Sequence, residues 1–166
     1  MILENKICSI TQELLNNIPQ NLSVQIPIVM IANNIGYKVL EFDPTESIEN
    51  VSGSVVNASK TIYINGDEHP YRRRYTIAHE IGHAVLHSDR AHVIDYRQNM
   101  INFSGGSQIE DEAHQFAMEL LMPAVKFKTL WRALDSKTDE IAARFGVPID
   151  VAEYRAGSLG LLYAIE

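Results

Sequence analysis

The chain lacks the features that mark secreted, membrane-spanning and nucleic-acid-binding proteins. A single cysteine, Cys8, allows neither an internal disulfide nor a cysteine-rich zinc site, which favours a reducing compartment. No run of about 18 apolar residues is present, and the N-terminus has no signal-peptide layout. Positive charge is in deficit, because 21 acidic residues outnumber 14 basic ones and give a formal net charge of −7. We therefore expect a cytoplasmic protein without a membrane span, whose overall field opposes binding to nucleic acid.

Hydrophobic periodicity predicts an α+β protein. Helical periods and stop signals place helices at about 2–17, 27–35, 70–87 and 107–122, and two or three further helices around 126–134, 137–145 and 149–157. Alternation predicts a strand at 37–42, and GSVVNASKTIYING predicts a hairpin with Asn57–Lys60 as its turn. Residues 88–106 show no clear period, so we expect a long loop there. The order helix, helix, small sheet, helices differs from alternating β-α-β units and favours the α+β class.

The stretch YTIAHEIGHAVLH places three ionisable side chains in what is otherwise a buried helix. Burying a polar group without a partner costs about 2–7 kcal/mol, so something must compensate. His79 and His83 are four residues apart, which stacks both imidazoles on one helix face within reach of one metal ion. Glu80 lies about 100° around the helix, where it is placed to take a proton from metal-activated water rather than to bind the ion. Gly82 removes a side chain beside the site, which would let another element approach closely.

A catalytic zinc site needs three protein ligands and one open position, so a third ligand must come from elsewhere. A histidine six residues after His83 is excluded, because Asp89 stands there. His87 lies one turn further along the helix, but three histidines on successive turns span about 12 Å, too far for one ion. We expect His87 to face the C-terminal helix dipole instead. His92, in the expected loop, is not a favoured ligand.

An acidic residue from a later helix is the other source of a third ligand. In QIEDEAHQFAMELLMP, Glu110 falls about 20° from Ala117 and so borders the buried apolar stripe. Glu112 falls about 100° away on the other side, and Asp111 points outward. The helical phase therefore favours Glu110 as the ligand, with Glu112 as the fallback. His114, one turn after Glu110, is either a partner of a ligand or, more typically, a surface histidine.

These stretches together resemble a known family. RRRYTIAHEIGHAVLH followed by EDEAHQFAMELLMP looks like the ImmA/IrrE family of zinc-dependent metallo-endopeptidases. SGSVVNASKTIYING resembles that family's strand segment before the metal helix, and IAARFGVPIDVAEYRAGSLGL resembles its closing helices. The resemblance covers roughly residues 25 to 160. The two helical stretches in combination are much more specific than H-E-x-x-H alone.

The resemblance implies a zincin-like fold, with a small, mainly antiparallel sheet packed on the metal-binding helix and further helices C-terminal. It implies His79, His83 and a glutamate of 110–112 as Zn²⁺ ligands, with Glu80 as general base. Mn²⁺ or another divalent ion fits the same donors. Where the family often has asparagine or aspartate after its E-A pair, this chain has His114. We expect a single metallopeptidase-like domain over 1–166, without an added DNA-binding or sensor domain and with three parts: an N-terminal helix (1–24), a catalytic core (25–122) and C-terminal helices (123–166).

The resemblance also implies a role. Family members occur in phages, mobile elements and stress-response loci, where several cleave, or are needed to inactivate, a helix-turn-helix repressor; others lie beside toxin–antitoxin modules. The expected function is therefore cleavage of a protein substrate, a transcriptional repressor. One alternative is a catalytically silent or partner-activated regulator that binds a repressor or toxin–antitoxin partner without cutting it. A hydrolase of small peptides or cell-wall fragments is weaker, because no export signal is present.

DNA binding is a further alternative with poor chemistry. DEIAARFGVPIDVAEYR has the outline of a helix-turn-helix. Its second helix, however, offers Asp150, Glu153 and Tyr154 with a single arginine, Arg155, which suits a polyanion badly. We do not expect direct binding to nucleic acid.

Several auxiliary roles stay open from the sequence. An electrophile for the oxyanion could come from Tyr75, His87, Tyr96 or an arginine, although Tyr75 at its spacing is typical of a core aromatic. The arginines at 72–74 are typical of a solvated first turn, or they could dock an acidic substrate segment. The strand at 61–65 could be a sheet edge that receives an extended peptide.

Overall fold

The computed structural model describes residues 2–19, 24–45, 47–90, 92–96 and 107–162. These residues form helices α1 (Ile2–Asn16), α2 (Ile28–Asn34), α3 (Pro70–Leu86), α4 (Gln108–Leu121), α5 (Ala124–Ala133), α6 (Thr138–Phe145) and α7 (Ile149–Ser158). The strands are β1 (Lys38–Phe42), β2 (Val51–Val56), β3 (Thr61–Asn65) and β4 (His92–Tyr96). Seven helices and a four-stranded sheet within the described ranges confirm the predicted α+β class. None of these helices is long and apolar enough to cross a bilayer.

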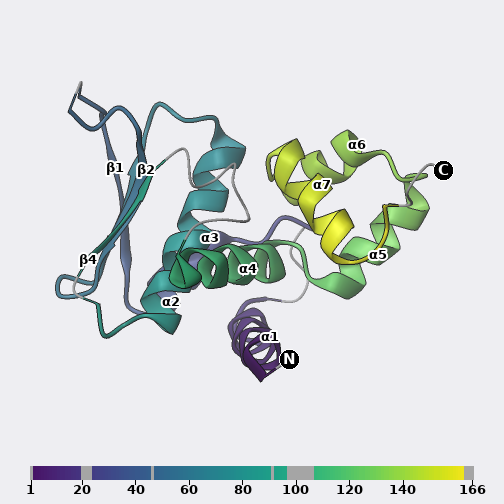
Figure 1. Cartoon of the computed structure of the whole chain (residues 1–166), viewed down its shortest axis with the longest axis horizontal. Coiled ribbons are helices and arrows are strands. Elements are labelled where there is room, and N and C mark those ends of the chain that lie inside the picture. The colour runs from purple at the N-terminus through teal and green to yellow at the C-terminus, as the bar shows by residue number, and fades with distance from the viewer. Residues whose placement is uncertain (1, 20–23, 46, 91, 97–106, 163–166) are drawn as a thin grey trace.

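The sheet and the C-terminal helices α5 to α7 lie at opposite ends of the molecule, with α3 and α4 between them (Figure 1). Helix α3 packs against β2 and β3 on one side and against α4 on another. Helix α1 packs against α4, where Ile7 is buried. The metal motif therefore lies on the central helix, in contact with both the sheet and α4. The division into three parts stays a prediction.

The strands follow the order β1-β3-β2-β4. The predicted hairpin is confirmed: β2 and β3 pair antiparallel, with Val55 opposite Ile62. Strand β1 pairs parallel to β3, with Lys38 opposite Thr61. Strand β3 is therefore internal, and the prediction that it forms a peptide-receiving edge is wrong. Among the described strands, the edges of the sheet are β1 and β4. Strand β1 pairs with the outer side of β3, and β4 pairs with the outer side of β2.

The predicted loop at 88–106 contains a strand. Residues 92–96 pair antiparallel with β2, with Val93 opposite Val55. The loop prediction is wrong for this segment, since the backbone of β2 supplies hydrogen bonds that local periodicity does not reveal. Residues 97–106 lie outside the described residues, as do the side chains of His92 and Tyr96.

Helix ends follow the predicted punctuation. Helix α2 begins directly after Pro27, and the chain leaves it through Gly36 at φ +85°. Helix α3 has Pro70 at its first position, and the side chain of His69 accepts a hydrogen bond from the backbone N–H of Tyr71. The start of the metal helix is thereby fixed about two and a half turns before His79.

Helices α3 and α4 approach each other closely at Gly82. A Cβ atom at Gly82 would lie 3.1 Å from Ala113 Cα and 3.2 Å from the Ala113 carbonyl oxygen. Both atoms belong to the backbone of α4, so they cannot move aside as a flexible side chain would. The expectation that Gly82 lets another element approach is confirmed, and the close crossing brings α4 side chains to the histidines of α3.

The substitution Gly82→Ala is expected to lower the free energy of unfolding. Overpacking costs about 1–3 kcal/mol, which exceeds the gain in helix propensity of about 1 kcal/mol. Gly157→Ala is the matched control, because a Cβ at Gly157 of α7 meets only a side-chain atom at 3.5 Å. Denaturant unfolding of both variants with excess chelator checks this. A Gly82→Ala variant as stable as Gly157→Ala would show that the crossing tolerates a methyl group.

Candidate metal centre

Two imidazoles from α3 and one carboxylate from α4 meet in the protein interior. The Nε2 atoms of His79 and His83 lie 3.0 Å apart. Glu110 Oε2 lies 3.2 Å from His79 Nε2, and Glu110 Oε1 lies 3.4 Å from His83 Nε2. One ligand atom from each residue lies within 4.8 Å of the others, a spacing that a single divalent ion can bridge. The structure thus brings together the three residues that helical spacing and phase select.

The charge states of this triad suit a cation. Burial lowers the pKa of His79 to about 3, and its hydrogen bond to Glu110 opposes this only in part, so the imidazole is neutral at pH 7. Burial raises the pKa of Glu110, but hydrogen bonds from His79 and His83 outweigh burial and hold that pKa well below its ordinary value. A neutral imidazole and an ionised carboxylate are the forms that bind divalent metals. The donor set therefore fits a metal ion.

Glu80 is fully buried and lies against the sheet. Its Oε1 atom is 3.2 Å from the point where a Cβ on Gly53 of β2 would stand, and the Thr76 methyl group is 2.5 Å from the same point. A larger residue at position 53 would therefore displace Thr76 or Glu80. The pairing of β2 with β4 also shifts register between Val51 and Gly53. The carboxylate of Glu80 thus lies close against β2, and its role as general base stays a prediction.

The fallback ligand Glu112 lies at a different histidine. Its Oε2 atom is 3.0 Å from His87 Nε2, and its Oε1 atom accepts a hydrogen bond of 2.7 Å from Gln108 Nε2. Burial raises the pKa of Glu112, but the hydrogen bonds to His87 and Gln108 lower it below its ordinary value. His87 Nδ1 lies 3.1 Å from His83 Nδ1. The predicted place of His87 at the end of α3 is confirmed, whereas helical spacing alone does not reveal these two contacts.

His114 is buried, and the interpretation of a surface histidine is wrong. Its side chain is 3% exposed, and its ring centroid lies 4.3 Å from that of His79. His114 Nδ1 lies 3.1 Å from the hydroxyl of Tyr75, which is fully buried. Tyr75 is therefore a core aromatic whose hydroxyl bonds to His114. The other aromatic candidate, Tyr96, has its side chain outside the described part of the chain.

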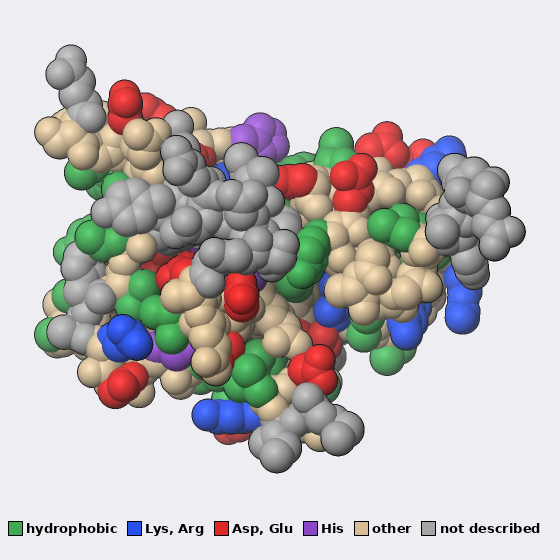
Figure 2. All heavy atoms as spheres, in the orientation of Figure 1, with side chains coloured by type: hydrophobic (Ala, Val, Ile, Leu, Met, Phe, Trp, Pro, Cys, Tyr) green, Lys and Arg blue, Asp and Glu red, His purple; other side chains and the backbone are tan. Residues whose placement is uncertain are grey.

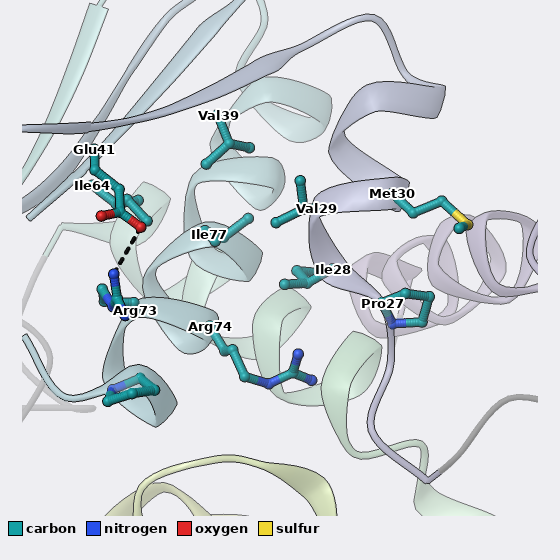
Figure 3. A pocket seen from close by; sticks show the side chains of 11 residues that line it. Pro27, Ile28, Val29, Met30, Val39, Glu41, Ile64, Arg73, Arg74 and Ile77 are labelled. Carbon is teal, nitrogen blue, oxygen red and sulfur yellow. Dashed lines mark hydrogen bonds and ion pairs between the residues drawn. The ribbon is translucent and has the colours of Figure 1, made fainter. Parts of the chain in front are cut away.

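The arginines that begin α3 contact other parts of the fold. Arg73 forms an ion pair of 2.7 Å with Glu41 of β1, at a hollow between α2, β1 and α3 (Figure 3). Arg74 donates hydrogen bonds to the carbonyl oxygens of Gly146, at 3.1 Å, and Ile26, at 2.8 Å. Burial lowers the pKa of Arg74 from its ordinary value. The prediction of a merely solvated first turn is wrong, because these side chains join α3 to the sheet and to neighbouring loops.

Helices α6 and α7 have the predicted helix-turn-helix outline, but two charged side chains of α7, Asp150 and Arg155, are used in contacts within the fold. Asp150 forms an ion pair of 3.1 Å with Arg72 of α3. Arg155 is 6% exposed, pairs with Glu119 of α4 and donates to the carbonyl of Met122 at 3.1 Å. On the face shown in Figure 2, the described basic side chains are interspersed with acidic ones and form no broad patch. This chemistry suits phosphate contacts poorly.

A His₂Glu set on a helix pair, beside a small mixed sheet, is a ligand arrangement that zinc hydrolases use. The fold and the triad thus define a candidate metallopeptidase-type hydrolase. The sequence model of the IrrE N-terminal-like domain, of the peptidase M78 family, matches residues 32–156. The chain belongs to this family, and the resemblance drawn from its motifs is confirmed.

Two further proteins are similar to this chain. The uncharacterized immunity region protein 2 of Bacillus phage phi105 is 28% identical over 137 residues, which cover 82% of this chain and 78% of the phage protein. The solved structure of a Mycobacterium tuberculosis transcriptional regulator matches 93% of this chain with a TM-score of 0.65 and 17% identity. This chain spans only 46% of that regulator's length, and the likeness shows the fold alone.

Proposed function

We propose that the protein is a zinc-dependent metallo-endopeptidase that cleaves a regulatory protein, such as a helix-turn-helix repressor of a phage, mobile element or stress-response locus. The observation that carries this proposal is the convergence of His79, His83 and Glu110 from two helices. Membership of the peptidase family supports it. These three residues are the proposed metal ligands, and Glu80 is the proposed general base.

Each protein group has a part in the proposed reaction. A bound divalent ion would supply a Lewis acid that polarises water and the scissile carbonyl. Glu80 accepts a proton from the attacking water and passes it to the departing amine. His79, His83 and Glu110 would hold the ion as its three protein ligands. Zinc is the proposed ion, and Mn²⁺ or another divalent metal fits the same donors.

A repressor is the proposed partner because the family resemblance implies one. The name of the similar phage protein, which refers to an immunity region, supports this proposal. The proposed reaction takes place in the cytoplasm, where a repressor works, and within one metallopeptidase-like domain whose core spans 25–122.

Metal-dependent cleavage of a candidate helix-turn-helix repressor tests the proposal. Protein purified without chelator is expected to hold a stoichiometric divalent metal, measured by mass spectrometry of the elements. Incubation of the two proteins should give defined repressor fragments, which disappear after chelation and return when Zn²⁺ is added. A protein that takes up no divalent metal at all would contradict the proposed function.

A partner-activated regulator is the second candidate, and the burial of the site favours it. His79, Glu80 and His83 have no exposed surface. A peptide reaches them only if surrounding residues move, and a partner or effector that binds the open form better would shift that equilibrium. In that case the metal-loaded protein alone leaves the repressor intact, and cleavage begins only when the partner or effector is added.

A further inference from the structure

We propose that His87 and Glu112 are a positioning pair, which holds the imidazole of His83 in the orientation that metal binding requires. The inference rests on the proposed metal site and adds to it two residues that bind no metal themselves. Its basis is an unbroken row of contacts. His83 Nδ1 lies 3.1 Å from His87 Nδ1, and His87 Nε2 lies 3.0 Å from Glu112 Oε2.

One assignment of protons satisfies every contact in this row. In the proposed metal-loaded state the Nε2 atom of His83, which lies 3.4 Å from Glu110 Oε1, would offer its lone pair to the ion. The proton of the neutral ring then sits on Nδ1 and is donated to His87 Nδ1, which accepts with its own lone pair. His87 consequently carries its proton on Nε2 and donates it to the Glu112 carboxylate. The reverse assignment would put a proton on the His83 atom that binds metal.

The arrangement extends a common device by one residue. A metal-binding histidine usually donates its second N–H to a carboxylate, a carbonyl or water, which fixes both tautomer and ring orientation. Here an additional imidazole, His87, stands between the ligand and the carboxylate. His87 is 6% exposed, so water competes little for these hydrogen bonds. Gln108 Nε2 donates to the free oxygen of Glu112 at 2.7 Å and so restrains the far end of the row.

The geometry of the helix pair separates the tasks of the two glutamates. Glu110 and Glu112 lie two residues apart on α4, whereas His83 and His87 lie one turn apart on α3. Glu110 contacts the Nε2 atoms of the metal-facing histidines, and Glu112 contacts only the outer one, His87. A purely structural hydrogen bond that joins α3 to α4 would also explain the contact between His87 and Glu112. It would not require any particular tautomer of His87 or any effect on metal affinity.

Zinc affinity, measured by competition with a chromophoric chelator, is the first test. Both Glu112→Ala and His87→Phe are expected to weaken Zn²⁺ binding by about 10- to 100-fold, the usual effect of losing a residue that orients a ligand. His87→Gln should recover much of this loss, because its carbonyl can accept from His83 and its amide can donate to Glu112. Asp111→Ala is the matched control, since Asp111 is an exposed neighbour on α4 with the same charge.

Nitrogen-15 NMR of the histidine rings in the Zn²⁺-loaded wild-type protein is the second test and needs no variant. His83 should carry its proton on Nδ1 and bind zinc through Nε2, and His87 should carry its proton on Nε2. A proton on Nδ1 of His87 would overturn the proposal, as would wild-type affinity in both Glu112→Ala and His87→Phe. If the wild-type protein binds no zinc, both the proposed function and this inference fail. If the wild-type protein binds zinc and both variants bind it equally well, the metal site stands and only the positioning pair is wrong.

Discussion

Replacing Glu80 with glutamine is expected to abolish peptide cleavage while the protein keeps its metal and its fold. Glutamine has nearly the same shape but no basic oxygen, and loss of a general base typically costs about 10²- to 10⁴-fold in rate. Glu80 lies outside the triad of His79, His83 and Glu110, so its substitution removes no proposed ligand. Glu80 is fully buried, and glutamine preserves its volume, so the fold is expected to remain unchanged.

Repressor cleavage, metal content and thermal unfolding, measured on the same preparations, check this result. Glu153→Gln is the matched control, because Glu153 is an exposed glutamate on α7 and the substitution changes charge in the same way. Cleavage by Glu80→Gln at the wild-type rate would remove Glu80 from the mechanism. If the variant does not cut the repressor but still inactivates it, the protein acts by binding. The catalytically silent regulator is then the correct interpretation.

Local sequence patterns predict much of the fold correctly. The errors concern segments whose structure depends on pairing with a distant part of the chain. Helical period, Pro70 and the turn at 57–60 place the metal helix and the hairpin correctly, because each is set by residues close in sequence. Strand β4 escapes prediction, since its five residues become a strand by pairing with β2. Strand β3 has an interior position because β1 pairs with it from 23 positions away, as in Lys38 opposite Thr61. Local alternation carries no information about strand order.

In the candidate site, likewise, local spacing predicts the ligand residues but not the contacts that depend on how two helices pack. The spacing of His79 and His83, together with the helical phase of Glu110, is sufficient to select three groups that the structure brings together. The contacts of His87 and Glu112 depend on how α4 lies along α3, which no single helix reveals. The H-x-x-x-H spacing continues from His83 to His87 and is the one signal in the sequence that could have led to this row. His87 lies too far along the helix from His79 to bind the same ion. It lies only one turn from His83, however, which is close enough for a hydrogen bond.

Replacing Glu110 with alanine is expected to weaken zinc binding by more than about 100-fold, beyond the range of residues that only orient a ligand. Glu110 supplies the carboxylate of the proposed ligand set, and both of its oxygens lie within 3.4 Å of an imidazole Nε2 atom. Without it, two neutral nitrogens remain to hold a divalent cation in a buried site, where an uncompensated charge is costly. Chelator competition on the refolded and the natively purified variant measures the loss.

Three neighbouring acidic residues on α4 allow the losses of zinc affinity in three alanine variants to be compared, and the proposed site predicts a different loss for each. Each loses one negative charge on substitution by alanine, so a general electrostatic effect would weaken zinc binding similarly in all three. The proposed site instead requires no change for Asp111→Ala, about 10- to 100-fold for Glu112→Ala and a larger loss for Glu110→Ala. Should Glu112→Ala cost more than Glu110→Ala, the third ligand would be Glu112, and α4 would have to shift along α3 when metal binds. Equal and small effects at all three positions would mean that the triad does not bind the ion.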